Sequence, residues 1–151
     1  MPQSLAQIYL HVVHSTKERR RYLQDPALRD ELHNYLGGIC RNLGCPSLVV
    51  GGVEDHVHIL CRFSRTITVA SLLAELKRES SKWVKTRSRE LFDFHWQDGY
   101  GAFSASPGDV EGLREYIRTQ EEHHKKESFQ VEFRRLLQAH GIEWDERYVW
   151  D

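Results

Sequence analysis

The chain has 151 residues, of which 40% are hydrophobic and 28% charged, and its formal net charge is −1. This length predicts one domain, residues 1–151, that can fold around a single core. The composition excludes a disordered or fibrous chain. No apolar run approaches the roughly 20 residues that cross a bilayer, and the start does not read as a secretory signal. Three cysteines without a CxxC pair favour reduced thiols. We therefore expect a cytoplasmic protein that does not enter a membrane.

The charges are segregated along the chain, so the near-zero total does not exclude a polyanionic partner. Residues 1–21 sum to +3 and residues 62–89 to +6, whereas residues 90–151 sum to −7. Two interpretations stay open, namely solvated helix faces or a basic surface that binds a polyanion. The basic candidates for DNA contacts are Lys17, Arg19, Arg20, Arg21, Lys77, Arg78, Lys82 and Lys85.

The first predicted elements are a strand and a helix joined by a basic loop. Residues 6–14 alternate with period two, which is typical of a strand. Residues 26–43 carry apolar side chains at steps of three and four, which predicts a helix capped by Asp25 with Pro26 in its first turn.

The middle of the chain predicts a hairpin followed by a long helix. The β-rich runs 47–53 and 56–63 are separated by only Glu54 and Asp55, which indicates an antiparallel hairpin. Residues 68–91 then show an apolar stripe at helical spacing, with most lysines and arginines on the outer face.

The last third of the chain predicts strands and then two helices. The segment 92–105 is rich in aromatic residues and suits one or two strands, and helices are expected over 110–126 and 128–140. The order of elements implies an α+β fold in which helices pack on an antiparallel sheet.

The first chemical candidate is the motif His56-Val57-His58 at the start of a predicted strand. Strand periodicity places both imidazoles on one face and Val57 on the other, presumed core, face. Two such imidazoles on an exposed sheet face can share a metal ion. The motif is weak by itself, so a metal site and structural histidines are about equally favoured.

The second candidate is the pair Tyr116 and Gln120, which share one face of the predicted helix 110–126. Tyr116 reads most simply as a boundary aromatic, but a phenol also attacks phosphodiesters once a cation polarises the phosphate. Gln120 offers an amide oxygen that would complete a His-His-Gln metal triad. His123 and His124 are spare candidates for metal or phosphate contacts.

Several segments together resemble the HUH single-tyrosine transposases of small hairpin-ended insertion sequences (transposase A type). The resemblance covers most of the chain and rests on HVVHSTKERRRYL at 11–23, GGVEDHVHIL at 51–60, LLAELKRESSKWV at 72–84, WQDGYGAFSAS at 96–106 and EYIRTQEEHHKKESF at 115–129. The combination of DHVH and YIxxQ is its most specific part. One departure is His14, which stands where an aromatic is expected.

The resemblance implies a ferredoxin/RRM-like HUH fold and a complete chemistry. His56, His58 and Gln120 would bind Mg²⁺ or Mn²⁺, and Tyr116 would attack a DNA phosphate to leave a 5′-phosphotyrosine and a free 3′-OH. The implied partners are single-stranded hairpin DNA and a second copy of the chain, in a homodimer whose Tyr116 helix can reach the partner's histidines. Two imidazoles and an amide suit Mn²⁺, Zn²⁺ or Co²⁺ as well as Mg²⁺.

Two other hypotheses stay open. One is a non-catalytic, domesticated module that binds hairpin nucleic acid. The other is a metal-dependent phosphodiesterase that uses activated water rather than Tyr116. If the chain is a transposase or a binding module, its basic stretches would bind the phosphate backbone of the nucleic acid. The aromatic segment 92–103 would offer rings on which unpaired bases stack.

Overall fold

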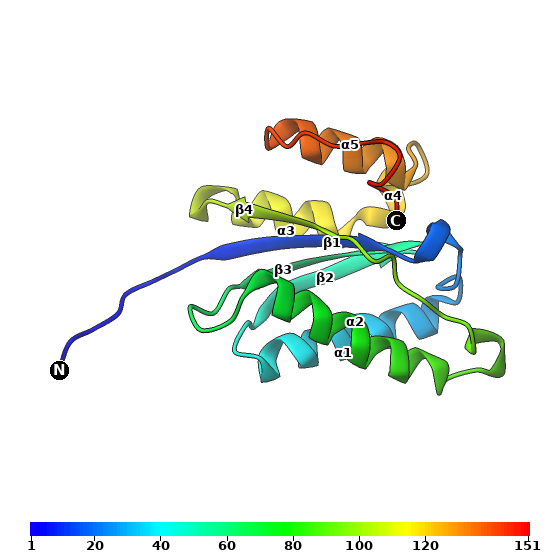
Figure 1. Cartoon of the computed structure of the whole chain (residues 1–151), viewed down its shortest axis with the longest axis horizontal. Helices are drawn as coiled ribbons and strands as arrows, with labels where there is room; N and C mark the ends of the chain where they lie inside the picture. The colour runs from blue at the N-terminus through cyan, green and yellow to red at the C-terminus, as the bar shows by residue number, and fades with distance from the viewer.

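The computed structural model describes residues 1–151 and contains one four-stranded antiparallel sheet with helices on both faces (Figure 1). The strands are β1 (Tyr9–Ser15), β2 (Ser47–Val53), β3 (His56–Arg62) and β4 (Gly101–Ala105). Their order across the sheet is β2-β3-β1-β4, the arrangement of the ferredoxin-like β-α-β-β-α-β unit. The predicted α+β fold is confirmed.

Helices α1 (Pro26–Asn42) and α2 (Val69–Lys85) cover one face of the sheet (Figure 1). Beneath them lies the larger core, a cluster of 17 buried residues that includes Val12, Val57 and Leu76. The predicted cap of α1 is confirmed, because the Asp25 carboxylate accepts a hydrogen bond from the Ala27 amide. No helix combines the length and apolar character needed to cross a bilayer.

Three further helices cover the opposite face: α3 (Val110–Arg118), α4 (Gln120–His123) and α5 (Phe129–Ala139) (Figure 1). Short 3₁₀ turns, η1 (Lys17–Arg19), η2 (Arg89–Leu91) and η3 (Pro107–Asp109), lie in the connections. Two smaller cores lie on this face, one under α5 around Phe103 and Phe133, the other under α3 around Leu60 and Ile117. This second layer of helices buries the strand face that carries both histidines of the HxH motif.

Two predicted helices end earlier in the structure, each beside a threonine whose hydroxyl bonds back into the helix. The helix expected over 68–91 ends at Lys85, where the Thr86 hydroxyl donates to the Trp83 carbonyl at 2.7 Å. The helix expected over 110–126 is broken at Thr119, whose hydroxyl donates to the Glu115 carbonyl at 2.8 Å. Such back-bonding competes with the helix ladder and bends helices.

Strand boundaries also differ from the prediction. Strand β1 begins at Tyr9, because its neighbours β3 and β4 end opposite that residue at Arg62 and Ala105. Residues 1–8 therefore extend beyond the sheet (Figure 1). The segment 92–105 supplies one strand, β4, and a single bridge between Thr16 and Trp96.

Candidate metal and nucleophile site

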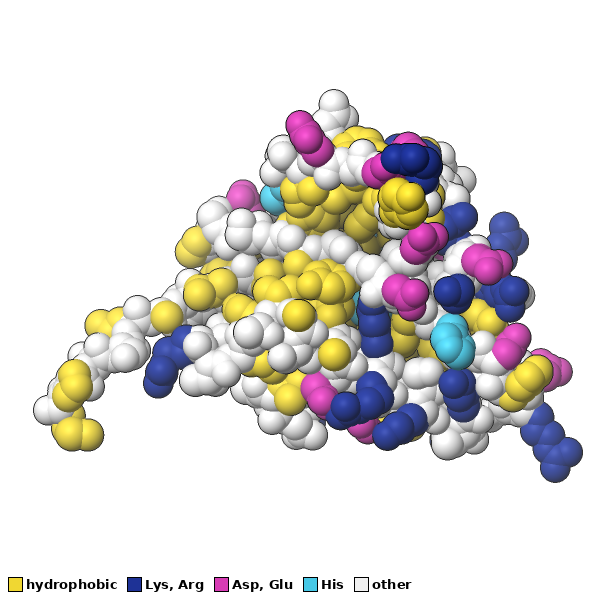
Figure 2. Space-filling model, in the orientation of Figure 1, with side chains coloured by type: hydrophobic (Ala, Val, Ile, Leu, Met, Phe, Trp, Pro, Cys, Tyr) yellow, Lys and Arg dark blue, Asp and Glu magenta, His cyan; other side chains and the backbone are white.

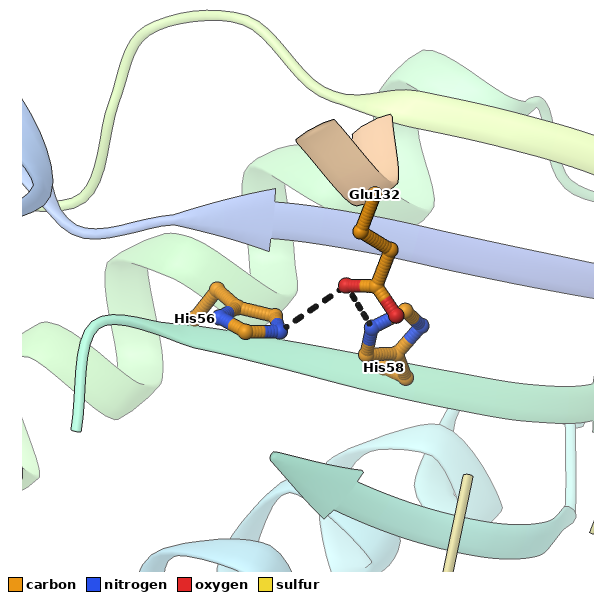
Figure 3. A group of neighbouring side chains, drawn as sticks. All are labelled: His56, His58 and Glu132. Atoms are coloured by element: carbon orange, nitrogen blue, oxygen red, sulfur yellow. Dashed lines mark hydrogen bonds and ion pairs between the residues drawn. The ribbon is translucent and has the colours of Figure 1, made fainter. Parts of the chain in front are cut away.

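His56 and His58 point from β3 toward helix α5, where they meet the carboxylate of Glu132 (Figure 3). The three side chains, here called the His–Glu cluster, are fully buried. Their ligand atoms all lie within 4.8 Å of one another. The sequence prediction of an exposed histidine face is wrong, because α4 and α5 cover it. The prediction that Val57 points into the opposite core is confirmed.

The Glu132 carboxylate gathers five polar side chains. Its Oε1 lies 3.0 Å from Nε2 of His58, 3.2 Å from Nε2 of His56 and 3.0 Å from Nε2 of His124. Its Oε2 accepts hydrogen bonds from the Tyr116 hydroxyl and from Nε2 of Gln120.

The structure also brings the sequence-predicted residues together. Gln120 is buried and its Oε1 lies 3.1 Å from Nε2 of His56. Tyr116 is half-buried, and its ring lies edge-on to His58 with centroids 5.9 Å apart. Of the two spare histidines, His124 joins the cluster through Glu132, whereas His123 packs against the Tyr116 ring at 4.7 Å. All of these side chains belong to one chain.

The donor atoms fit a divalent metal ion. Small divalent ions hold ligands at about 2.1 Å in near-octahedral shells, so neighbouring ligand atoms lie about 3.0 Å apart. The distances from Nε2 of His56 to Oε1 of Gln120 and Oε1 of Glu132 are 3.1 and 3.2 Å, and Nε2 of His58 lies 3.0 Å from the same Glu132 oxygen. Four side chains thus place neighbouring candidate ligand atoms at this spacing, which is also the length of a hydrogen bond.

Burial and charge shift the pKa values in the cluster. Burial opposes the charged form of His56, but hydrogen bonds and charge interactions with Asp55 and Glu132 outweigh it and raise its pKa to about 9. Burial lowers the pKa of His58. Burial would raise the pKa of Glu132, but hydrogen bonds from His124, His56 and His58 hold it far below its usual range. Glu132 is thus a buried anion that is paired with His56, whose raised pKa favours the imidazolium form.

Burial and the adjacent Glu132 charge raise the pKa of Tyr116, while Arg135 opposes that shift. The Arg135 guanidinium donates to the Tyr116 hydroxyl at 3.0 Å and pairs with Glu127 at 2.6 Å. The Tyr116 hydroxyl therefore stays protonated until a positive charge nearby compensates the negative charge of Glu132. Arg135 and a bound metal ion are the two sources of such charge.

Two glycines let the helices of the site approach the sheet. A Cβ atom on Gly51 in β2 would lie 2.3 Å from the Ile117 carbonyl oxygen, at the end of α3. A Cβ atom on Gly101 in β4 would lie 2.6 Å from Cε1 of Phe133, the neighbour of Glu132 on α5. Both approaches require a residue without a side chain.

Residues 4–120 match the family described as "Transposase IS200 like". The chain belongs to the IS200-like transposase family. Glu132 and the whole of α5 lie beyond the residues that match.

Two solved structures share the fold of this chain. A putative transposase from Deinococcus radiodurans R1 superposes with a TM-score of 0.62 at 19% identity, over 80% of this chain and 95% of that one. A REP-associated tyrosine transposase bound to a REP hairpin superposes with a TM-score of 0.55 at 12% identity, over 78% of this chain and 68% of that one. A search of curated proteins found no match.

The predicted basic residues of the chain fall into two groups. Arg19 and Arg21 line a cavity of about 530 Å³ together with Lys125, Lys126 and the acidic Glu18, Glu54 and Glu127. Asp55 and His124, which contact the His–Glu cluster, line the same cavity. Lys17 and Arg20 line a neighbouring cavity of about 280 Å³. The sequence prediction did not include Lys125 and Lys126.

The basic residues of α2 lie on the other side of the sheet, away from the cluster. Lys and Arg side chains gather over α2 and the segment that follows it, at the lower right of Figure 2. Arg78, Lys82 and Lys85 are exposed, and Lys85 forms no ion pair. Lys77 differs, because its ammonium donates to the carbonyls of Gln97, Asp98 and Gly99 at 2.7–2.9 Å. All three of its donors are used in holding this loop, which leaves none for a phosphate.

Most aromatic residues of the segment 92–103 are structural. Phe94, Trp96 and Phe103 are buried in the cores and cannot stack on bases. Phe92 and Tyr100 are exposed, and Tyr100 lies under the Lys77 ammonium at 5.5 Å. The predicted stacking platform is therefore reduced to these two rings.

Proposed function

We propose that the transposase cleaves and rejoins single-stranded DNA at hairpin-containing ends through a covalent 5′-phosphotyrosine on Tyr116. The observation that carries this proposal is the shared carboxylate: the Tyr116 hydroxyl is bonded to Glu132, which also contacts both histidines of the HxH motif. The candidate nucleophile and the candidate metal ligands thus meet at one point, although they lie on three different elements.

In the proposed reaction, the Tyr116 oxygen attacks phosphorus and the bond to the 3′ oxygen breaks. The phenol proton is released, and the departing 3′ oxygen takes up a proton to become a free 3′-OH. Attack of a 3′-OH on the phosphotyrosine reverses these steps and joins strands, so no nucleotide hydrolysis is required. Arg135, which donates to the Tyr116 hydroxyl, supports the developing phenolate.

The residues that would hold a divalent ion are His56, His58, Gln120 and Glu132, and we favour Mg²⁺ or Mn²⁺. Such an ion would polarise the scissile phosphate and offset the Glu132 charge that raises the pKa of Tyr116. Asp55 supports the site from behind, because its carboxylate accepts a hydrogen bond from Nδ1 of His56 at 2.7 Å.

We propose that the single strand reaches the site through the cavity between η1 and the loop after α4. Four basic side chains line it, Arg19, Arg21, Lys125 and Lys126, together with the four acidic side chains Glu18, Glu54, Asp55 and Glu127. Asp55 and His124 connect it to the His–Glu cluster. The exposed basic face of α2 is the second phosphate-binding surface in this proposal. Hairpin DNA as the substrate is supported by the REP hairpin bound to the related transposase.

The homodimer implied by the family resemblance stays a prediction, which light scattering of the protein with and without hairpin DNA tests. The geometry adds one constraint: a single chain brings Tyr116 to its own histidines. We therefore propose that cleavage takes place in cis, whether or not two chains associate.

The experiment compares Tyr116→Phe with Tyr35→Phe on a hairpin-ended single strand in the presence of Mn²⁺. Tyr35 is a matched control, since it is half-buried but stacks on Trp83 on the opposite side of the sheet. We expect denaturing gels to show covalent protein–DNA adducts for the wild type and Tyr35→Phe, and none for Tyr116→Phe, with hairpin binding retained.

Other outcomes separate the remaining hypotheses. Strand cleavage that persists in Tyr116→Phe contradicts the proposal and indicates activated water as the nucleophile. Hairpin binding that is equally strong with divalent ions chelated, together with no cleavage by the wild type, indicates the non-catalytic binding module.

A further inference from the structure

His11 lies directly behind His58 and takes no part in the proposed reaction. It belongs to strand β1, next to β3, and only 2% of its surface is exposed. Its Nε2 lies 2.8 Å from Nδ1 of His58, and the two rings stack with centroids 5.1 Å apart and an interplanar angle of 20°. The two ring nitrogens therefore share one hydrogen between them.

The direction of this hydrogen bond determines what the other nitrogen of His58 can do. A neutral imidazole carries one N–H, and a nitrogen that binds a metal must carry none. Nε2 of His58 is the atom that faces Glu132 at 3.0 Å. If Nε2 binds a metal ion, the ring proton is on Nδ1 and donates to Nε2 of His11.

The partner of His56 is different in kind. Nδ1 of His56 faces the Asp55 carboxylate at 2.7 Å. An ionised carboxylate only accepts hydrogen bonds, so it keeps a proton on Nδ1 of His56 with or without a metal ion on the other ring nitrogen. A neutral imidazole can donate or accept, so the contact between His11 and His58 can run in either direction.

We propose that His11 is a positioning residue that sets the tautomer of His58 and reverses its own hydrogen bond when a metal ion binds. This inference rests on the metal site of the proposed function. Without metal, Nε2–H of His11 donates to Nδ1 of His58, and Nε2–H of His58 donates to Glu132. With metal, Nδ1–H of His58 donates to Nε2 of His11.

The proton balance of this change is neutral for the two rings together. His58 loses the proton on Nε2 and gains the one on Nδ1 from His11, while His11 gains a proton on Nδ1 from solvent. One proton leaves the pair and one enters it, so both rings stay neutral. The buried pair thus accepts a cation without gaining charge of its own.

The direct test is ¹⁵N nuclear magnetic resonance of the histidine rings in the full chain, without metal and with Zn²⁺ as a diamagnetic probe. We expect His58 to change from the Nε2–H to the Nδ1–H tautomer on addition of Zn²⁺, and His11 to change in the same sense. The proposal is overturned if His11 keeps its proton on Nε2 in the Zn²⁺-bound protein, or if His58 is already Nδ1–H without metal.

Substitutions give a second test through metal affinity measured by calorimetry with Mn²⁺ and Zn²⁺. His11→Leu removes the acceptor, and loss of such an outer partner weakens metal binding about 10–100-fold. His11→Gln keeps an acceptor oxygen and is expected to restore most of this loss. The matched control is His14→Leu, since His14 is buried on the same strand but packs against Trp96, away from the cluster.

The outcomes distinguish this inference from the proposed function. If His11→Leu binds the ions as tightly as the wild type, the positioning role is wrong while the metal site stands. If the wild type binds neither ion, the metal site itself fails. If His11→Leu does not fold, the positioning role of His11 is still tested by the ring spectra of the wild type and by the metal affinity of His11→Gln.

Discussion

Replacing Glu132 with glutamine removes the buried charge to which five side chains are bonded. One carboxylate oxygen accepts hydrogen bonds from His58 and His124 and pairs with His56, and the other accepts from Tyr116 and Gln120. An amide has only one accepting oxygen, so in either orientation its NH₂ group faces groups that donated to the carboxylate.

The expected cost follows from the number of bonds lost. Hydrogen bonds to a charged group contribute about 1.5–3 kcal/mol each. The loss of about two of them gives about 3–6 kcal/mol, which overlaps the range of about 3–5 kcal/mol for removing one partner of a buried ion pair. For a chain of this length, we expect the melting temperature of the metal-free protein to fall by about 6–24 °C.

Metal binding adds a second, independent readout. An ion at 100 times its dissociation constant stabilises the wild type by about 2.7 kcal/mol. If Glu132 is a ligand, its loss weakens binding at least about tenfold, and the stabilisation by the same Mn²⁺ concentration falls to about 1.4 kcal/mol.

The assay is urea unfolding of both proteins with and without Mn²⁺, with the exposed Glu143→Gln as the charge-matched control. If the free energy of unfolding of metal-free Glu132→Gln lies within about 1 kcal/mol of the wild-type value, the contacts of the Glu132 carboxylate do not stabilise the fold as argued. An unchanged Mn²⁺ increment in this variant shows that Glu132 is not a ligand.

Three further predictions concern side chains outside the cluster. His14 is buried with neither ring nitrogen bonded, so His14→Phe should raise the free energy of unfolding in urea by about 1–2 kcal/mol; a decrease would contradict the unpaired histidine. Burial lowers the pKa of His33 from 6.5 to about 4, so the unfolded chain takes up a proton in that window while the folded chain does not. Folding stability should fall by about 2–3 kcal/mol between pH 6.5 and 4 through this group, and His33→Leu should flatten the pH profile there by that amount. Lys77→Met should cost about 2–3 kcal/mol because three carbonyls lose their donor, whereas the unpaired Lys85→Met should stay within about 0.5 kcal/mol in the same assay.

The local parts of the fold were predictable from the sequence. The Asp25 cap, the hairpin at 47–62 and the spacing of Tyr116 and Gln120 each depend on residues close in the chain. The breaks at Thr86 and Thr119 were missed, since a threonine hydroxyl that bonds its own helix looks no different in sequence from one that faces solvent.

The candidate site was predictable except for its carboxylate. In α5, the apolar residues Phe129, Phe133 and Leu137 repeat at helical spacing, and Glu132 stands on the same stripe. A charged residue on an inward stripe is a signal for a buried polar site, because an unpaired charge there is too costly to keep. The sequence cannot show that the histidines of β3 are the partners of Glu132, because α5 and β3 are about 70 residues apart in the chain.

Gly51 and Gly101 give a way to recognise relatives that share this chemistry. Neither glycine touches a reacting group, yet each lies under a helix that delivers one: α3 with Tyr116, and α5 with Glu132. A methyl group at Gly51 would collide with the backbone of α3 and push Tyr116 away from the histidines, whereas one at Gly101 would collide with the rings of Phe133 and Phe103, on which α5 and its Glu132 are seated. Homologues that keep every reactive residue but carry larger side chains at these two strand positions are therefore expected to have lost cleavage, and a search that scores only HxH, Tyr and Gln would miscount them as active.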